Sequence, residues 1–573
     1  MKPGLFNLFS ALSILLLVVA SQSPAQTPQR DNLPRTASIS GRVTVGGKPA
    51  ANAMVMVMEV DPDSKHFSGY VSSHHALVKV RTDGDGRYQV TGLATGAYQV
   101  RALSKAYAQA NSSLQYDLFK SVTLDEGESR DHVDFALVRG GAITGRVTDA
   151  EGRPFIAANP ELLLLDGGSN PRERYDFNSR HLTPPDDRGI YRFYGLPAGR
   201  YILSVSGRYS GRRKYPSAFY PGVTDIGQAK VIEVKEGKEV TGIDIRLGVA
   251  EKVYEVAGRV IDAETGRAAP RAGVVCARVD GEEAGYSRSV EADEQGRFKI
   301  ERLSAGRYEL WSTNRREENG QPNGGKITFE INGADVSGLE VRGARASALS
   351  DVVVLEGAIT GRVSGPEGLS LEDVEVYASR IGGGHNSDHS ASSDEEGNFK
   401  LTGLAPGLYL VGSRAPGFIG AGASTENAIH RIGESVSINL TRGGVITGRV
   451  TDETGEPIVG VAVNPYLLRD LEGQTASRWH DGSFIGSETD DRGIYRIYGL
   501  LPGVYVISIG GSDDWPSDTA RIKRDTPTYH PSSTRDAAAE ITVRGGEEVS
   551  GIDIRHRAER GHIVSGALST VFG

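Results

Sequence analysis

The sequence predicts an all-β protein made of five tandem β-sandwich modules arranged in a rod. Three observations lead to this prediction. One turn-and-strand motif recurs five times in the same register, a strand with a central glycine precedes each copy, and a closing strand follows it. We number the motif from the glycine of its first turn, which is Gly86, Gly189, Gly296, Gly397 and Gly493. Five copies in one register indicate a single structural unit that has been repeated.

Each copy of the motif predicts a turn, a strand, a second turn and another strand. An aspartate lies three residues before the glycine, as in Asp490 and Gly493. This spacing is typical of a type I turn, which the aspartate caps and in which the glycine takes a positive φ. The next residues alternate in polarity, which predicts a strand with one face in a core. Twelve residues after the glycine lie Tyr98, Tyr201, Tyr308, Tyr409 and Tyr505. A tyrosine at such a place buries its ring and bonds its hydroxyl to the backbone, as in the tyrosine corner.

The strands around each motif set the module boundaries. The opening strands carry Gly41, Gly145, Gly258, Gly361 and Gly448, and closing strands such as 240–245 and 549–554 follow the motifs. The stretch from each opening strand to its closing strand is roughly 85–115 residues long, which is the size of a single sandwich domain. We therefore predict modules 1 to 5 at residues 37–139, 140–249, 250–355, 356–441 and 442–556. Short linkers should keep adjacent modules in contact.

Modules 2 and 5 resemble each other most. Both contain an Asn-Pro pair, the run Asp-Asp-Arg-Gly-Ile-Tyr-Arg and a long insert after the tyrosine strand. The inserts are residues 207–226 and 510–535. Loops at the ends of sandwiches often carry function on a rigid scaffold, so these inserts are the first places to look for a binding site.

The combination of a Gly-Arg-Val opener, an Asp-x-x-Gly turn and Leu-x-x-Gly-x-Tyr resembles the carboxypeptidase regulatory-like domain. That family has the transthyretin-like, or carbohydrate-binding-like, fold, an Ig-like seven-stranded β-sandwich. The resemblance covers nearly all of residues 37–556 and implies an accessory domain without catalytic residues, found also in bacterial exported proteins. Some related folds bind starch or other glycans, and others form stalks in adhesins. The resemblance assigns no role to particular residues here.

The two ends of the chain differ from the modules. Residues 1–25 combine Lys2, an apolar run and a small-residue cleavage site, which predicts a secretory signal peptide. Residues 26–36 form a linker, and no later stretch is apolar enough for a transmembrane span. We expect the mature protein to be secreted, periplasmic or on the cell surface. Residues 557–573 predict a lone strand or the start of an incomplete sixth module.

Composition argues against several partners and chemistries. The net charge is −9 and no basic stripe stands out, so nucleic acid is not expected as a partner. The single cysteine, Cys276, cannot form an internal disulfide, and its alternating surroundings predict a buried thiol. We expect no cofactor, no metal site and no catalytic residues. His385, Asp388 and His389 could together meet a metal ion, but a polar loop holds ligands poorly. Position twelve from Asp83 is Ala94, where a calcium-binding loop of the EF-hand type needs a glutamate.

The inserts supply the candidate ligand-contact residues. Aromatic rings stack on sugar faces, while arginines bind hydroxyl or acid groups, so we predict contacts from Tyr209, Arg213, Tyr215, Trp515 and Arg521. Other ring-bearing residues of the inserts are expected to pack onto their own sandwiches instead of contacting a ligand. These are Phe219, Tyr220, Tyr529 and His530.

Together these observations predict a non-catalytic exported protein, not an enzyme, that serves in binding, adhesion or spacing. A glycan is the favoured ligand class, and a cell-surface protein is the other candidate partner. Two alternatives remain open. The first alternative is that the chain is a purely structural stalk. The second is that it is the accessory region of an enzyme or outer-membrane receptor whose main domain is absent.

Overall fold

The structure is a computed structural model of the whole chain. It describes residues 36–557 apart from the internal segments 52, 61–77, 104–105, 110–119, 166–181, 207–208, 211–212, 282–283, 294, 314–324, 344–356, 367–368, 370, 373, 383–387, 421–428, 475–486 and 511–525. Within these residues the regular structure consists of β-strands and two 3-10 turns, η3 (Ile226–Gln228) and η4 (Arg535–Ala537). The predicted all-β class is confirmed. The predicted signal peptide and all but Arg557 of the C-terminal segment 557–573 lie outside the described residues.

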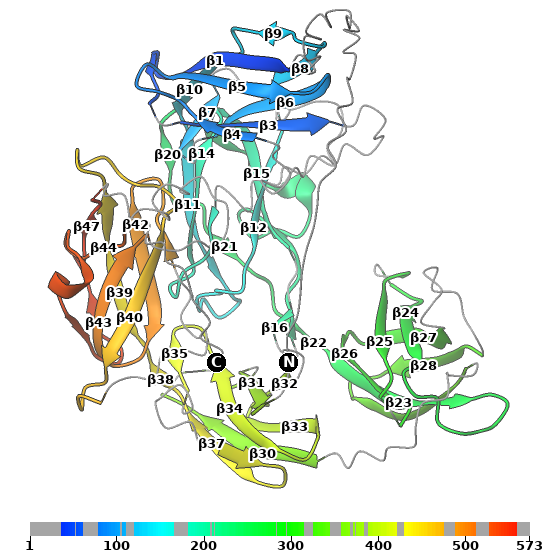
Figure 1. Cartoon of the computed structure of the whole chain (residues 1–573). Helices are drawn as coiled ribbons and strands as arrows, with labels where there is room; N and C mark the ends of the chain where they lie inside the picture. The colour runs from blue at the N-terminus through cyan, green and yellow to red at the C-terminus, as the bar shows by residue number, and fades with distance from the viewer. Residues whose placement is uncertain are drawn as a thin grey trace, which may run out of the picture.

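The strands form five successive sets, most of them built around two facing sheets (Figure 1). The first set has one sheet of β1 (Ala37–Val45), β2 (Lys48–Pro49), β5 (Arg87–Leu93), β7 (Tyr107–Gln109), β9 (Ser129–Arg130) and β10 (Phe135–Arg139). Its other sheet is β4 (Val78–Arg81), β3 (Met54–Val60), β6 (Gly96–Leu103) and β8 (Lys120–Leu124).

The second set adds a small sheet that its insert makes with the next linker. Its main sheets are β13 (Leu182–Thr183), β14 (Ile190–Leu196), β11 (Gly141–Thr148), β20 (Glu239–Val240) and β21 (Ile245–Arg246), and β12 (Pro160–Leu164), β15 (Gly199–Val205), β18 (Ala218–Phe219) and β19 (Ile232–Val234). The small sheet is β16 (Tyr209–Ser210), β17 (Arg213–Lys214) and β22 (Glu251–Lys252).

The third and fourth sets are the leanest. The third has sheets of three and four strands: β26 (Arg297–Leu303), β23 (Tyr254–Asp262) and β29 (Val336–Gly343), and β25 (Ser287–Glu291), β24 (Gly273–Arg278), β27 (Gly306–Thr313) and β28 (Ile327–Ile331). The fourth has β33 (Asn398–Leu404), β30 (Gly357–Ser364) and β37 (Ser435–Asn439), then β32 (Asp388–Ser392), β31 (Glu375–Arg380), β34 (Leu408–Arg414) and β36 (Ile429–Arg431), and the pair β35 (Phe418–Ile419) and β38 (Thr441–Arg442).

The fifth set repeats the plan of the second. Its sheets are β42 (Ile494–Leu500), β39 (Gly444–Thr451), β46 (Glu548–Val549) and β47 (Ile554–Arg555), and β41 (Ser487–Glu488), β40 (Ala462–Arg469), β43 (Gly503–Ile509), β44 (Thr528–Tyr529) and β45 (Ile541–Val543). In every set the opening strand pairs antiparallel with the motif strand and parallel with a closing strand, as β39 does with β42, β46 and β47.

The motif folds as its residue types predict. The aspartate of each first turn accepts hydrogen bonds from two backbone N–H groups, as Asp490 does from Arg492 and Ile494. The turn glycines have φ between 70° and 83°, a region that other residues rarely adopt. The five tyrosine hydroxyls each donate to a backbone carbonyl four residues earlier, for example Tyr201 to Pro197. The predicted tyrosine corner is therefore present in all five copies.

The central glycine of each opening strand has a separate structural reason. A Cβ atom at Gly145 would lie 1.8 Å from the carbonyl oxygen of Ile243, which belongs to the closing segment. The same clash, at 2.1–2.2 Å, occurs at Gly41, Gly258, Gly361 and Gly448. Only glycine permits the close approach of the closing segment to the opening strand.

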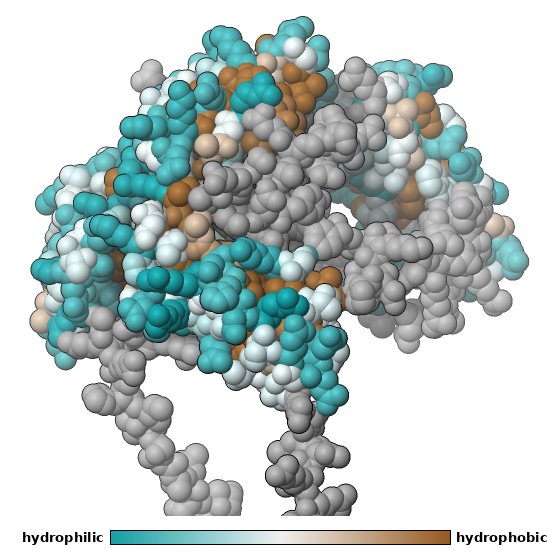
Figure 2. All heavy atoms as spheres, turned by 90° about the horizontal axis from the view of Figure 1, so that it is seen from above, coloured by the Kyte–Doolittle hydropathy of each residue, from teal (hydrophilic) through white to brown (hydrophobic). Residues whose placement is uncertain are grey.

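Each set buries its own hydrophobic core. The buried side chains form five clusters, and each cluster draws on the strands of one set. The face drawn in Figure 2 is dominated by hydrophilic residues, with hydrophobic residues gathered in patches. These clusters support the division into five modules, whose boundaries stay a prediction. No helix in the described part of the chain is long and apolar enough to cross a membrane.

The predicted rod is wrong. Strands β39 and β42 of the fifth set lie beside β11 and β14 of the second set, and the third set stands apart from the others (Figure 1). Hydrogen bonds join Arg192 to Asp491 across 299 residues of sequence. The physical reason is that modules 2 and 5 carry matching charges on the outer faces of their motif strands, so the chain folds back to bring them together.

Candidate functional site: the junction of modules 2, 4 and 5

The outer face of the motif strand distinguishes modules 2 and 5 from the rest. In β5, β26 and β33 the outward residues are almost all exposed, which gives the alternation expected of a sheet with one face in water. In β14 the outward residues are buried or half-buried, and in β42 only Ile494 at the start of the strand is exposed. Arg192, Tyr194 and Tyr498 are among them. Ion pairs join the two strand regions, and β7 of module 1 and β35 of module 4 also contact β14 and β42, respectively.

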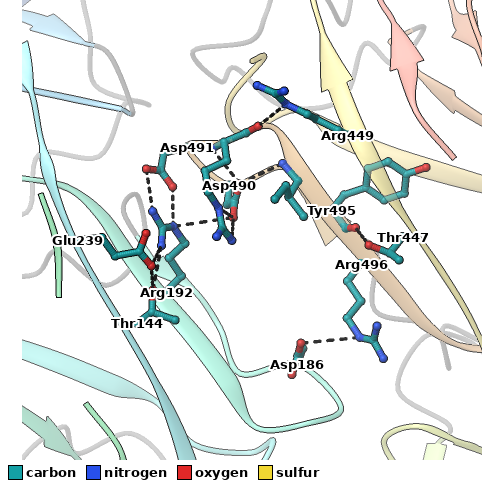
Figure 3. Close-up of polar contacts among 12 residues, drawn as sticks. Thr144, Asp186, Arg192, Glu239, Thr447, Arg449, Asp490, Asp491, Tyr495 and Arg496 are labelled. Carbon is teal, nitrogen blue, oxygen red and sulfur yellow. Dashed lines mark hydrogen bonds and ion pairs between the residues drawn. The ribbon is translucent and has the colours of Figure 1, made fainter. Parts of the chain in front are cut away.

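Two reciprocal arginine–aspartate pairs hold the two faces together, and Figure 3 shows the pair that Arg192 makes with Asp491. The Arg192 guanidinium donates from Nε and Nη2 to the two carboxylate oxygens of Asp491, at 2.6 and 3.1 Å. Arg496 makes the equivalent bonds to Asp187, at 2.6 and 2.9 Å. Two parallel N–H···O bonds to one carboxylate are the strongest ion-pair geometry available to arginine. We call these two pairs the clasp.

Each clasp arginine also binds a glutamate from its own closing strand. Arg192 donates from Nη1 to Glu239 at 2.6 Å, and Arg496 Nη1 lies 2.9 Å from Glu548. Glu239 and Glu548 hold equivalent places on β20 and β46. The arrangement differs in one detail, because Arg192 also donates to Thr144 at 2.9 Å, whereas Thr447 donates to the Tyr495 carbonyl.

The clasp arginines are nearly buried, so their charges interact closely with those of the neighbouring carboxylates. The arginine side chains are only 6% and 11% exposed. Burial opposes the charge of Arg192, but the hydrogen bonds and charges of Asp491 and Glu239 outweigh it and raise the pKa of the guanidinium. Burial likewise opposes the charge of Glu239, yet the bonds from Arg192 and Thr144 lower the pKa of this carboxyl. Arg192 and Glu239 are therefore both charged at neutral pH.

Local structure explains why these four side chains face outward. In module 2, Asp186 caps the turn, so its neighbour Asp187 is left to point away from the module. Tyr191 and Phe193 point into the core, and the alternation of a strand places Arg192 on the opposite face. Module 5 repeats both features.

A cavity of about 640 Å³ lies beside the clasp, between modules 2, 4 and 5. Its polar lining is mainly arginine, with Arg153, Arg188, Arg213, Arg414, Arg442 and Arg496 set against the acids Asp149, Asp187, Glu372 and Glu548. Most of these arginines already bind a carboxylate, as Arg153 binds Asp149 and Arg414 binds Glu375. The lining of described residues thus carries a small excess of positive charge.

Two of the cavity arginines stack on aromatic rings. The guanidinium of Arg442 lies 5.8 Å from the centre of the Phe418 ring, and that of Arg414 lies 4.6 Å from the centre of the Tyr377 ring. Arg442 is exposed, and within the described residues it has no ion-pair partner. A guanidinium that lies over an aromatic ring keeps N–H groups that can bind an acceptor.

The structure brings two of the five predicted contact residues to this cavity. Arg213 lines it and forms an ion pair with Glu372 of module 4. Tyr215 also lines it, but its side chain is 8% exposed and its ring centre lies 4.3 Å from that of Phe155. Tyr209 lies on β16, paired with Lys214. Trp515 and Arg521 fall outside the described residues. A role in ligand contact stays a prediction for all five.

The aromatic residues expected to fold back do so. Phe219 lies on β18, which pairs with β15, and Tyr220 packs against the core of module 2. Tyr529 is buried on β44, and His530 Nδ1 lies 2.6 Å from the Asp553 carbonyl oxygen. These side chains belong to their own sandwiches.

Other predictions concern residues away from the junction. Cys276 is buried, and its burial raises the pKa of the thiol to about 12. His389 lies on β32, and His385 is outside the described residues. Among the described residues, no group of three His, Cys, Asp or Glu side chains is arranged to hold a metal ion.

Sequence reasoning missed the clasp, although a signal was present. Relative to the turn glycine, only modules 2 and 5 have aspartate at −2, arginine at +3 and tyrosine at +5. In module 1 the same places hold Gly84, Gln89 and Thr91. The sequence shows the resemblance between modules 2 and 5, but turn and strand roles account for these residues when each module is considered by itself.

Comparison with known protein families bears on the modules themselves. Residues 38–138 and 358–440 match the carboxypeptidase regulatory-like domain. These two segments carry this domain. The matched segments correspond to modules 1 and 4, and the other three modules share the same turn, tyrosine corner and opening glycine.

Solved structures show a distant likeness in fold. A streptococcal ancillary pilin is 13% identical, covers 54% of this chain and 99% of its own, and has a TM-score of 0.23. The Bacillus anthracis TIE protein is 15% identical; the match covers 72% of this chain and 75% of that protein, with a TM-score of 0.15. The major pilin subunit BcpA of Bacillus cereus is 12% identical; the match covers 55% of this chain and 100% of that protein, with a TM-score of 0.15. No curated protein matches the chain.

Proposed function

We propose that this chain is an exported, non-catalytic binding protein, and that the cavity between modules 2, 4 and 5 takes an acidic glycan. The single observation that carries the proposal is the exposed Arg442 guanidinium stacked on Phe418 at the edge of an arginine-rich cavity. Export is supported by the signal-like residues 1–25. The accessory character of regulatory-like domains supports the absence of catalysis.

The chemistry of the lining selects the ligand class. Sugar rings offer apolar faces that pack on aromatic side chains, and uronic acid groups offer carboxylates that pair with guanidinium. The cavity combines Phe418 and Tyr498 with the six arginines. Its volume is in the range of small-molecule sites, so it would accommodate a short stretch of a glycan chain. A neutral glycan would leave the positive charge of Arg442 without a partner.

The test is binding to an acidic polysaccharide measured by affinity electrophoresis in gels that contain polygalacturonate, with neutral dextran as the comparison. We expect the protein to be retarded by polygalacturonate and not by dextran. Arg442→Ala should abolish the retardation, whereas Arg87→Ala, which removes an exposed arginine in module 1, should preserve it. Equal retardation of both variants, or no retardation of the wild type, would overturn the proposal.

A second candidate function is a structural spacer, which the buried clasp favours. A clasp that holds modules 2 and 5 together fixes the geometry of the chain whether or not a ligand binds. Failure of every acidic and neutral glycan to bind, with the clasp intact, would favour this candidate.

A further inference from the structure

The clasp has the symmetry of a dimer interface within one chain. Arg192 binds Asp491 and Arg496 binds Asp187, so the same two positions of the motif act as donor and acceptor on both sides. Tyr194 and Tyr498 add a third equivalent pair of buried residues. This reciprocity defines an isologous contact, the kind found in two-fold symmetric dimers.

The contact is costly to leave open. Each arginine is nearly buried and holds two carboxylates, one from each module. Separation of the modules exposes the tyrosines and leaves Arg192 with Glu239 and Thr144 of its own module. Exposure of buried aromatic rings to water is unfavourable, so contact is favoured over separation. An open chain therefore has a strong tendency to restore the same pairs with whatever matching surface it meets.

The chain between the two surfaces does not determine which copy supplies the partner. Strands β23 to β37, with two hydrophobic cores of their own, lie between module 2 and module 5. Module 5 of a second copy would offer module 2 the same side chains in the same geometry. The two arrangements differ mainly in effective concentration, which favours the closed monomer when the protein is dilute.

From this symmetry we propose that a second copy of this chain occupies the clasp in trans, so that module 2 of each copy pairs with module 5 of the other. The result is a closed dimer by exchange of modules, in which all four arginine–aspartate pairs are kept. Exchange of identical elements is a low-cost route to dimers. The partner is set by charge, because only modules 2 and 5 carry the aspartate, arginine and tyrosine combination.

Two complementary variants of the full chain test this proposal. Arg192→Asp places two acidic groups on module 2, so its own module 5 repels it at Asp491. Asp491→Arg places two basic groups on module 5, so its own module 2 repels it at Arg192. Neither chain can close a complete clasp within itself. In a mixture, the acidic module 2 of the first variant matches the basic module 5 of the second, and the remaining two modules keep the natural pairs.

The measurement is molar mass by light scattering after size-exclusion chromatography. We expect each variant alone to have the mass of one chain, and their equimolar mixture to have twice that mass. A mixture that keeps the mass of a single chain would overturn the proposal. So would a dimer formed equally by the Arg192→Asp chain alone, since it would indicate pairing between two copies of module 5.

A chain that carries both substitutions is the folding control. Its module 2 is acidic and its module 5 is basic, so the clasp closes within one chain and we expect a compact monomer with the circular dichroism spectrum of the wild type. If this double variant is compact but the mixture of single variants does not associate, the clasp acts within one chain only and exchange is excluded.

Discussion

Arg192 and Arg496 occupy the same position of a repeated motif, and each binds the aspartate that lies two residues before the turn glycine of the other's module. The two contacts span 299 and 309 residues of sequence. They turn a tandem array into a folded-back structure. Module 4 contacts both modules, through the ion pair between Arg213 and Glu372 and through β35 beside β42, and the cavity where we propose ligand binding lies between the three.

Arg496→Ala should destabilise the contact between modules 2 and 5. The substitution leaves Asp187 and Glu548 without their shared cation, and loss of one member of a buried pair costs about 3 kcal/mol. Urea unfolding followed by circular dichroism measures the change. Gln89→Ala, at the equivalent exposed position of module 1, is the matched control and should change stability by less than about 0.5 kcal/mol. Equal effects of the two substitutions would contradict the clasp.

The clasp should weaken in acid through Glu239. The pKa of this carboxyl is lower in the folded protein than in the unfolded chain, because bonds from Arg192 and Thr144 outweigh the effect of burial. Its stabilisation is therefore complete above the unfolded pKa, about 4.3, and is lost as the pH falls through the lower folded pKa.

We expect Glu239→Gln to have a smaller loss of stability than the wild type between neutral pH and acid. The measurement is the urea midpoint across that pH range, with the exposed Glu233→Gln as the control. Parallel pH profiles for the wild type and Glu239→Gln would show that Glu239 does not couple to the fold.

Gly145→Ala should be among the most damaging single substitutions in module 2. The new Cβ would lie 1.8 Å from the Ile243 carbonyl oxygen, so the closing segment would have to move. Overpacking of this kind costs about 3 kcal/mol. Gly84→Ala, where nothing lies within 4 Å, is the control and should leave stability nearly unchanged. The measurement is thermal unfolding of both variants. If Gly145→Ala leaves the melting temperature unchanged, the opening strand and the closing segment at Ile243 are not in close contact.

Cys276 should react slowly with a thiol reagent in the native protein. Its side chain is buried in the core of module 3, and its thiol pKa is raised to about 12, so almost no thiolate exists at pH 8. We expect rapid reaction with dithionitrobenzoate only after addition of denaturant. Fast native labelling would show that this core opens or is built differently.

The sequence predicts the inside of each module well, because turn and core residues act locally. Asp490 caps its own turn, Tyr505 bonds a carbonyl four residues away, and the glycine spacing sets the strands between them. These contacts depend on spacing alone, so a repeated spacing is enough to reveal them. The fold class and the tyrosine corners were therefore within reach of sequence reasoning.

The arrangement of the modules is not predictable from the sequence in this way, because it depends on pairing between distant surfaces. Asp187 and Arg496 are ordinary solvated residues in any single module, and only their burial against each other gives them a role. Short linkers predict a rod, but they constrain only neighbouring modules and do not prevent the chain from folding back. Tyr215 was expected to contact a ligand, yet its ring lies against Phe155 because the insert packs onto module 2.

A double-mutant cycle on Arg192 and Asp491 tests the central claim most directly, since the two residues belong to different modules and lie 299 positions apart. Unfolding free energies are measured for the wild type, Arg192→Ala, Asp491→Ala and the double variant. We predict a coupling energy of about 2 kcal/mol, as is found for residues in direct contact. Additive effects, with a coupling energy near zero, would show that modules 2 and 5 do not pair in solution.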